Sequence, residues 1–169
     1  MTAAPDGVAT TTGAQRPLRI LFACVGNSAR SQMAEALLAA KGGPAFAPAS
    51  GGIVASSVHP LTVVVLSEVG IDWSGASSKP LAPMLERSWD LVVTVCDEAA
   101  EACPVIPPPT AVLHWDFEDP AAATGTEAER LAVFRRVRDE IGASIDDLLA
   151  DDDARAAIMH SRPTIGASG

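Results

Sequence analysis

The sequence contains no tyrosine, and aromatic residues make up only 4% of it. Basic residues are also scarce, with 12 lysines and arginines against 21 aspartates and glutamates and a net charge of −9. This acidic balance disfavours a nucleic-acid or anionic-membrane partner, so an anionic substrate has to be attracted by local groups. No apolar run reaches the roughly 18 residues of a membrane span. We therefore expect no nucleic-acid partner and no membrane partner.

The sequence has only three cysteines, Cys24, Cys96 and Cys103. Three cysteines cannot all be paired in disulfides within one chain. Residues 1–17 lack the charged-then-apolar order of a signal peptide, which predicts a cytoplasmic protein. An odd number of cysteines in such a chain disfavours a disulfide framework and favours free thiols, some of them reactive. Zinc is disfavoured as well, because there is no C-x2-C pair and the three histidines are scattered.

The apolar pattern predicts one α/β domain, for which 169 residues provide a sizeable core. Apolar runs and helical spacings alternate along the chain, which indicates a four-stranded parallel sheet sandwiched between helices in three layers. The predicted strands are 18–24, 46–50, 90–96 and 111–115, and the predicted helices are 31–41, 60–69 and a long last helix. We expect the domain to span residues 18–152, with disordered tails at 1–17 and 153–169.

The last helix has a clear start signal. Thr126 followed by Glu129 fits a capping box, in which each side chain bonds to the backbone of the other residue. Apolar residues then mark one face at helical spacing: Leu131, Phe134, Val137, Ile141, Ile145 and Leu148. This face is predicted to pack on the core.

The stretch CVGNSARS, residues 24–31, joins the first predicted strand to the first predicted helix. In a parallel sheet such a loop lies where ligands bind, with its backbone amides converging at a helix N-terminus. Small residues let the loop curl around a tetrahedral oxyanion, Arg30 adds a planar fork of donors, and the same field favours the thiolate of Cys24. The alternative is an ordinary buried cysteine at a strand end. The placement of C-x5-R-S between a strand and a helix favours the functional interpretation.

The other two cysteines suggest a relay. Cys96 ends the strand 90–96 and therefore lies on the same sheet edge as Cys24, and Cys103 follows across the short segment DEAAEA. If Cys96 reaches Cys24, thiol exchange can pass an oxidising equivalent from the Cys24 site to the pair Cys96 and Cys103. The alternative is that Cys96 is a core residue and Cys103 an incidental loop thiol.

The sequence resembles the thioredoxin-coupled arsenate reductases, which are built on the low-molecular-weight tyrosine phosphatase fold. The resemblance covers about residues 18–149 and rests on the motifs CVGNSARSQMAEALL, GIDWSGASSK, DLVVTVCDEAAEACP, HWDFEDPAAATG and FRRVRDEI. It implies that Cys24 is the nucleophile, Arg30 the oxyanion clamp, and Asp119, which directly precedes Pro120, the general acid. It also implies that Cys96 and Cys103 form the redox relay. The substrate loop it implies comprises Val25, Gly26, Asn27, Ser28, Ala29, Arg30 and Ser31.

The resemblance implies that the protein reduces arsenate to arsenite, is re-reduced by thioredoxin, and needs no metal and no organic cofactor. It also implies a weak phosphatase side activity. One alternative is a low-molecular-weight phosphotyrosine phosphatase that uses Cys24, Arg30 and Asp119; the absence of tyrosine around the pocket and the presence of the cysteine pair disfavour it. Another is a thiol-based arsenite or redox sensor, for which the acidic composition offers no DNA-binding element.

One position departs from part of the family. Some thioredoxin-coupled members bind potassium beside the loop through an acidic residue in the segment that here reads SGASSK, where this chain has Lys79. The other ligands that the resemblance implies, Asn27, Glu35 and Ser50, remain. We expect the Lys79 ammonium to lie within about 4 to 6 Å of Glu35 and to compensate its charge. Outside the motifs, we expect His59 to be a turn or helix-cap residue.

Overall fold

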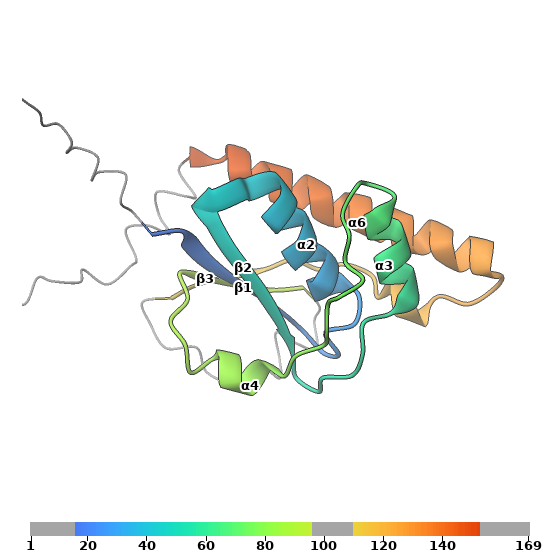
Figure 1. Cartoon of the computed structure of the whole chain (residues 1–169), viewed down its shortest axis with the longest axis horizontal. Coiled ribbons are helices and arrows are strands. Elements are labelled where there is room, and N and C mark those ends of the chain that lie inside the picture. The colour runs from blue at the N-terminus through green and yellow to red at the C-terminus, as the bar shows by residue number, and fades with distance from the viewer. Residues whose placement is uncertain (1–15, 96–109, 153–169) are drawn as a thin grey trace, which may run out of the picture.

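The computed structural model describes residues 16–95 and 110–152, and its centre is a parallel sheet (Figure 1). The sheet has four strands in the order β2-β1-β3-β4. Their bounds are β1 (Leu18–Cys24), β2 (Phe46–Gly52), β3 (Leu91–Thr94) and β4 (Ala111–His114). The predicted parallel α/β architecture is therefore confirmed. Of the tails expected to be disordered, 1–17 and 153–169, residues 1–15 and 153–169 fall outside the described residues. Residues 16 and 17 are described, and Arg16 pairs with Asp90 at 2.8 Å.

Three of the helices are those that the sequence pattern predicted. They are α2 (Arg30–Gly42), α3 (Pro60–Ser67) and α6 (Glu127–Ala150). Helix α2 ends where Gly43 takes a φ of 62°, a left-handed conformation that glycine adopts without steric cost. Helix α6 begins with the predicted capping box between Thr126 and Glu129. Three short elements were not predicted: η1 (Gly43–Ala45), α4 (Leu81–Met84) and η2 (Pro120–Ala122).

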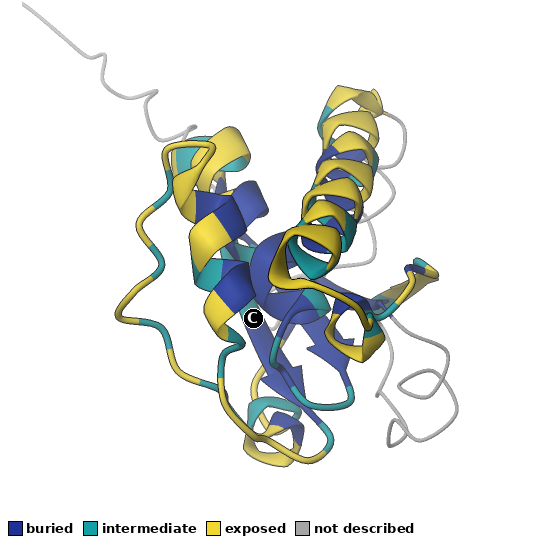
Figure 2. Ribbon diagram, turned by 90° about the vertical axis from the view of Figure 1, so that its right-hand side faces the viewer, coloured by how far each residue is buried: buried dark blue, intermediate teal, exposed yellow. Residues whose placement is uncertain are grey.

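Strands β1 and β3 are buried between two unequal layers, whereas the edge strand β4 is largely exposed. Because side chains alternate along a strand, Ile20 and Phe22 of β1 face one side and Leu21 and Ala23 the other. The larger core lies between the sheet and helices α2, α3 and α6, whose inner faces are buried in Figure 2. The smaller core lies beneath α4 and contains Leu21, Ala23, Leu81, Trp89 and Val92. This packing holds β1 between two strands and two layers, and β1 ends at Cys24.

Candidate active site

The segment 25–29 turns from the end of β1 to the start of α2. Cys24 is the last residue of the strand, as the sequence predicted, and the helix begins at Arg30, one residue before the predicted start at Ser31. The loop therefore lies at the carboxyl end of the sheet and at the N-terminus of a 13-residue helix. Both positions favour anions, since the helix N-terminus offers N–H groups without intrahelical partners.

The loop is concave because its carbonyl groups bond to the surrounding chain. Four of them accept hydrogen bonds from the segment that follows β2: Cys24 from Ile53 N–H, Val25 from Val54 N–H, Gly26 from Ser56 N–H and Ser28 from His59 N–H, at 2.9 to 3.2 Å. In a trans peptide the C=O and the next N–H point in opposite directions. The N–H groups of the loop are thereby turned to its inner side, which is the arrangement of an anion-binding nest.

The Cys24 thiol lies at the base of this nest, with 3% of the residue exposed. Its Sγ is 2.8 Å from Ser31 Oγ and accepts the backbone N–H of Asn27 at 3.2 Å. Hydrogen bonds donated to a sulfur atom favour its thiolate form, and the thiolate is the reactive form. The geometry thus fits a nucleophile beneath a bound oxyanion.

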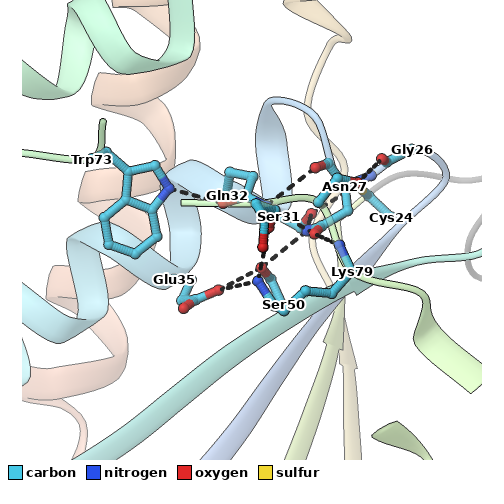
Figure 3. A network of polar contacts seen from close by, with 11 residues as sticks. Cys24, Gly26, Asn27, Ser31, Gln32, Glu35, Ser50, Trp73 and Lys79 are labelled. Carbon is cyan, nitrogen blue, oxygen red and sulfur yellow. Dashed lines mark hydrogen bonds and ion pairs between the residues drawn. The ribbon is translucent and has the colours of Figure 1, made fainter. Parts of the chain in front are cut away.

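Asn27 shapes the loop from within. Its φ of 50° lies in the left-handed region, which asparagine tolerates better than most residues. Its buried side chain uses every hydrogen-bonding position (Figure 3): Nδ2 donates to Ser31 Oγ at 2.8 Å and to Ser50 Oγ at 2.9 Å. Oδ1 accepts from Gln32 Nε2 and from the backbone N–H of Lys79, both at 2.8 Å. Three segments of the chain, helix α2, strand β2 and the segment of Lys79, are therefore tied to the loop through one amide.

Behind this amide lies a charged pair. Ser50 Oγ donates to Glu35 Oε1 at 2.5 Å, and Lys79 Nζ lies 3.4 Å from the same oxygen. The expected proximity of Lys79 to Glu35 is therefore confirmed. The ammonium compensates a carboxylate whose side chain is only 17% exposed.

Arg30 and Asp119 meet at the rim of the loop. Arg30 donates to the carbonyl oxygen of Phe117 at 3.1 Å, and its Nη2 lies 3.7 Å from Asp119 Oδ2. Asp119 also caps η2 by accepting the N–H of Ala121 at 3.0 Å. The neighbouring Glu118 instead pairs with Arg136 on α6. Of these two acids, Asp119 is the one held beside Arg30.

His59 is the N-cap of α3, in agreement with the helix-cap interpretation. Its Nδ1 accepts the N–H of Leu61 at 3.0 Å, and its ring lies 4.7 Å from the Phe134 ring. Burial is the main cause that lowers the pKa of His59 below 6.5; the charge of Arg130 adds to this effect and that of Asp119 opposes it. The neutral imidazole is the form that caps the helix.

The two relay cysteines, Cys96 and Cys103, lie outside the described residues. The chain just before Cys96 is described: Val95 N–H bonds to the carbonyl of Ala23 at 2.9 Å. Strand β3 therefore runs beside β1 up to the level of Cys24. Within residues 16–95 and 110–152 no cluster of histidine, cysteine and acidic side chains could hold a metal ion, and no helix is long and apolar enough to cross a membrane.

The sequence analysis missed three residues that shape the site. Gly52 is the last residue of β2, and a Cβ on it would lie 2.7 Å from the backbone nitrogen of Asn27. Adjacent glycines such as Gly51 and Gly52 at a strand end are a sequence signal of such close approach. Gln32 is fully buried against Asn27, and Trp73 donates its indole N–H to Gln32. These last two contacts join distant segments and have no local sequence signal.

A buried thiol under a loop of inward N–H groups, with an arginine at the rim, defines a thiol site fitted to tetrahedral oxyanions. The chain matches the family described as low molecular weight phosphotyrosine protein phosphatase over residues 19–158. It is 46% identical to an arsenate reductase of Bacillus licheniformis over 126 residues, which covers 75% of this chain and 91% of the relative. The chain belongs to this phosphatase family, on the branch of the arsenate reductases.

Solved structures agree with this assignment. One is an arsenate reductase in the phosphate binding state, with a TM-score of 0.64, 33% identity, and coverage of 79% of this chain and 97% of that chain. Another is a thioredoxin-dependent arsenate reductase of Corynebacterium glutamicum, with a TM-score of 0.65, 30% identity, and coverage of 92% and 69%. The expected low-molecular-weight tyrosine phosphatase-like fold is confirmed.

Proposed function

We propose that this protein reduces arsenate to arsenite, with Cys24 as the nucleophile and Val25 to Ser31 as the oxyanion-binding loop. The observation that carries the proposal is the position of Cys24 Sγ, which accepts a loop N–H at 3.2 Å and contacts Ser31 Oγ at 2.8 Å. An oxyanion in the nest would lie against this sulfur. The names of the relatives on the same family branch support arsenate as the substrate.

In the first step the Cys24 thiolate attacks arsenic, and an As–S bond forms as an As–O bond breaks. Asp119 as general acid protonates the departing oxygen, which leaves as water. Arg30 Nη2 lies 3.7 Å from Asp119 Oδ2. A bound oxyanion competes for the guanidinium, which frees the Asp119 carboxyl for the proton transfer.

In the second step the Cys96 thiolate attacks Cys24 Sγ. The S–S bond forms, the As–S bond breaks, and its electron pair reduces arsenic to arsenite. Cys103 then attacks Cys96, which releases Cys24 as a thiol and leaves a Cys96–Cys103 disulfide. Thioredoxin is proposed as the dithiol protein that reduces this disulfide, with support from the thioredoxin-dependent neighbour. A cytoplasmic location fits this chemistry, since thiols persist in a reducing compartment.

A steady-state assay tests the proposal. Purified protein is supplied with arsenate, thioredoxin, thioredoxin reductase and NADPH, and both arsenite formation and NADPH oxidation are followed. We expect one arsenite for each NADPH, and none with Cys24→Ser. Glutaredoxin and a mycothiol-type donor in place of thioredoxin test the choice of reductant.

The same assay separates the phosphatase alternative. A phosphotyrosine phosphatase would use Cys24, Arg30 and Asp119 to hydrolyse a phosphate ester, with water completing the cycle. Rapid hydrolysis of an activated aryl phosphate without any arsenite formation would contradict the reductase proposal. Slow hydrolysis beside efficient arsenate reduction is the expected side activity.

A further inference from the structure

A chain of hydrogen bonds leads from Cys24 to a tryptophan on a distant segment (Figure 3). Trp73 Nε1–H donates to Gln32 Oε1 at 2.8 Å. Gln32 Nε2 donates to Asn27 Oδ1 at 2.8 Å, and Asn27 Nδ2 donates to Ser31 Oγ at 2.8 Å. Ser31 Oγ lies 2.8 Å from Cys24 Sγ.

The indole nitrogen of Trp73 fixes the direction of the bonds from Trp73 to Ser31. An indole nitrogen can only donate, so Gln32 must present its oxygen to Trp73 and its NH2 group to the other side. There three acceptors meet the NH2 group: the side-chain and backbone oxygens of Asn27, at 2.8 and 3.2 Å, and the backbone oxygen of Ser77, at 3.0 Å. Asn27 therefore presents its own NH2 group to Ser31. Ser31 Oγ accepts this N–H, and when Cys24 is a thiolate the hydroxyl of Ser31 is the group that can donate to Sγ.

We propose that Trp73 and Gln32 are positioning residues that orient this chain of donors and thereby favour the thiolate of Cys24. The inference rests on the proposed role of Cys24 as nucleophile. Neither residue touches the sulfur. Their effect passes through Asn27 and Ser31. It ends in a hydrogen bond donated to Sγ, which favours the charged form of the thiol.

Burial makes this orientation effective. Asn27, Ser31 and Gln32 are all completely shielded from solvent, so water cannot replace a lost partner. A buried donor or acceptor that loses its partner is costly, and neighbouring hydrogen bonds polarise one another in a low dielectric. Lys79 N–H is a second donor to Asn27 Oδ1 at 2.8 Å, so loss of Gln32 weakens the preferred orientation without abolishing it.

The test measures the thiolate of Cys24 without any turnover. The rate of iodoacetamide alkylation is followed as a function of pH on the full-length reduced protein, because alkylation proceeds through the thiolate. Trypsin cuts after Arg19 and Arg30 and releases residues 20–30, whose only cysteine is Cys24, so mass spectrometry isolates this site from Cys96 and Cys103. The variants are Trp73→Phe, which keeps the ring and removes the N–H, and Gln32→Met, which keeps the length and removes the amide.

We expect the midpoint of the alkylation profile to move up by about half a pH unit in Trp73→Phe and about one unit in Gln32→Met. Trp89→Phe is the matched control, because Trp89 Nε1 donates to Met84 O at 2.7 Å in the smaller core, away from the loop. Its midpoint should stay at the wild-type value.

An unchanged midpoint in Trp73→Phe with native circular dichroism would overturn the proposal, and so would an equal shift in Trp89→Phe. Trp73 is only half-buried, so Trp73→Phe is the variant expected to fold even if Gln32→Met does not. The result is independent of arsenate turnover. A shifted profile in a protein that does not reduce arsenate would therefore refute the proposed function and leave this inference intact.

Discussion

Gly52 is a residue at which strand β2 lies directly against the oxyanion loop. A Cβ there would lie 2.7 Å from Asn27 N and 2.8 Å from both Gly26 C and Val25 O. All three atoms belong to backbone, which cannot move aside without distorting the loop. We expect Gly52→Ala to lower the free energy of unfolding by about 1 to 3 kcal/mol and to reduce arsenate turnover at least roughly tenfold. Urea unfolding and the coupled arsenate assay measure the two effects.

Gly75→Ala is the matched control for that substitution. The position is exposed and a Cβ there meets no atom within 4 Å. Its stability and turnover should stay close to wild type. Equal losses in both variants would show that the close approach at Gly52 is not the cause.

Lys79 determines whether a monovalent cation matters. Its ammonium already compensates Glu35 at 3.4 Å. We therefore expect turnover to be unchanged when potassium replaces sodium at constant ionic strength. Lys79→Asp should lower turnover in sodium and create a potassium dependence, because two carboxylates then need a cation. Activation of the wild-type protein several-fold by potassium would contradict the compensating role of Lys79.

His59 makes stability depend on pH. Its pKa is lowered in the fold, so between that value and 6.5 the unfolded chain binds more protons than the folded one. The contribution of His59 to the free energy of unfolding is therefore fully present above pH 6.5 and is lost as the pH falls below it. Protonation also removes the acceptor for Leu61 N–H, whose loss costs about 1 kcal/mol, as for other N-caps.

The substitution His59→Asn isolates this effect, since asparagine caps helices and does not titrate. Thermal unfolding midpoints are compared between about pH 7.5 and about pH 5.5, a window that spans the ordinary histidine pKa. The wild-type midpoint should fall more than that of His59→Asn. Parallel curves for the two proteins would exclude His59 as the titrating group.

At the scale of elements, hydrogen bonds at the first turn of helix α6 stabilise its start. Thr126 Oγ1 accepts the N–H of Glu129 at 3.1 Å, and Glu129 Oε2 accepts the N–H of Thr126 at 2.8 Å. We expect Thr126→Ala to lower the free energy of unfolding by about 1 kcal/mol. Thr126→Ser keeps the hydroxyl and should retain most of the stability in urea titrations. A Thr126→Ala protein as stable as wild type would show that packing of α6 alone sets its start.

The elements that the sequence predicted are those with strong apolar periodicity. β1 was placed at its observed bounds, and α2, α3, β2 and β4 within a few residues, because buried strands and amphipathic helices leave a repeating pattern. Strand β3 was predicted as 90–96 but spans Leu91–Thr94; Val95 is described and lies outside the strand, and Cys96 falls outside the described residues. α4 was missed because it comprises only four residues with a proline inside, so it has no period to detect.

At the scale of the whole molecule, the proposed relay predicts where a blocked cycle stops. Cys103→Ser should release about one arsenite per protein and then stop with Cys24 joined to Cys96, because the last exchange lacks its thiol. Rapid quench and mass mapping of tryptic peptides detect both the single turnover and the disulfide. Cys24→Ser is the control and should release none. Continued cycling of Cys103→Ser with thioredoxin would contradict the relay.

The parts of the candidate site that are local in the sequence could be predicted, and the contacts between distant segments could not. The loop 24–31 is local, so its place between strand and helix could be foreseen from the sequence. The proximity of Lys79 to Glu35 was expected only through the family resemblance. The Arg30–Asp119 pair and the Trp73–Gln32 bond join residues 89 and 41 positions apart, and such contacts depend on how the layers pack. The catalytic roles of Cys24, Arg30, Asp119, Cys96 and Cys103 stay predictions.

The position of β1 between β2 and β3 has a consequence for amide hydrogen exchange. The backbone of β1 is paired on both sides and covered on both faces, so its amides exchange with solvent only when the whole domain opens. We therefore expect β1 to be the slowest-exchanging strand of the sheet and Cys24, at its end, to keep its position while the domain is folded. Any sulfur atom that forms a bond with it has to travel to it.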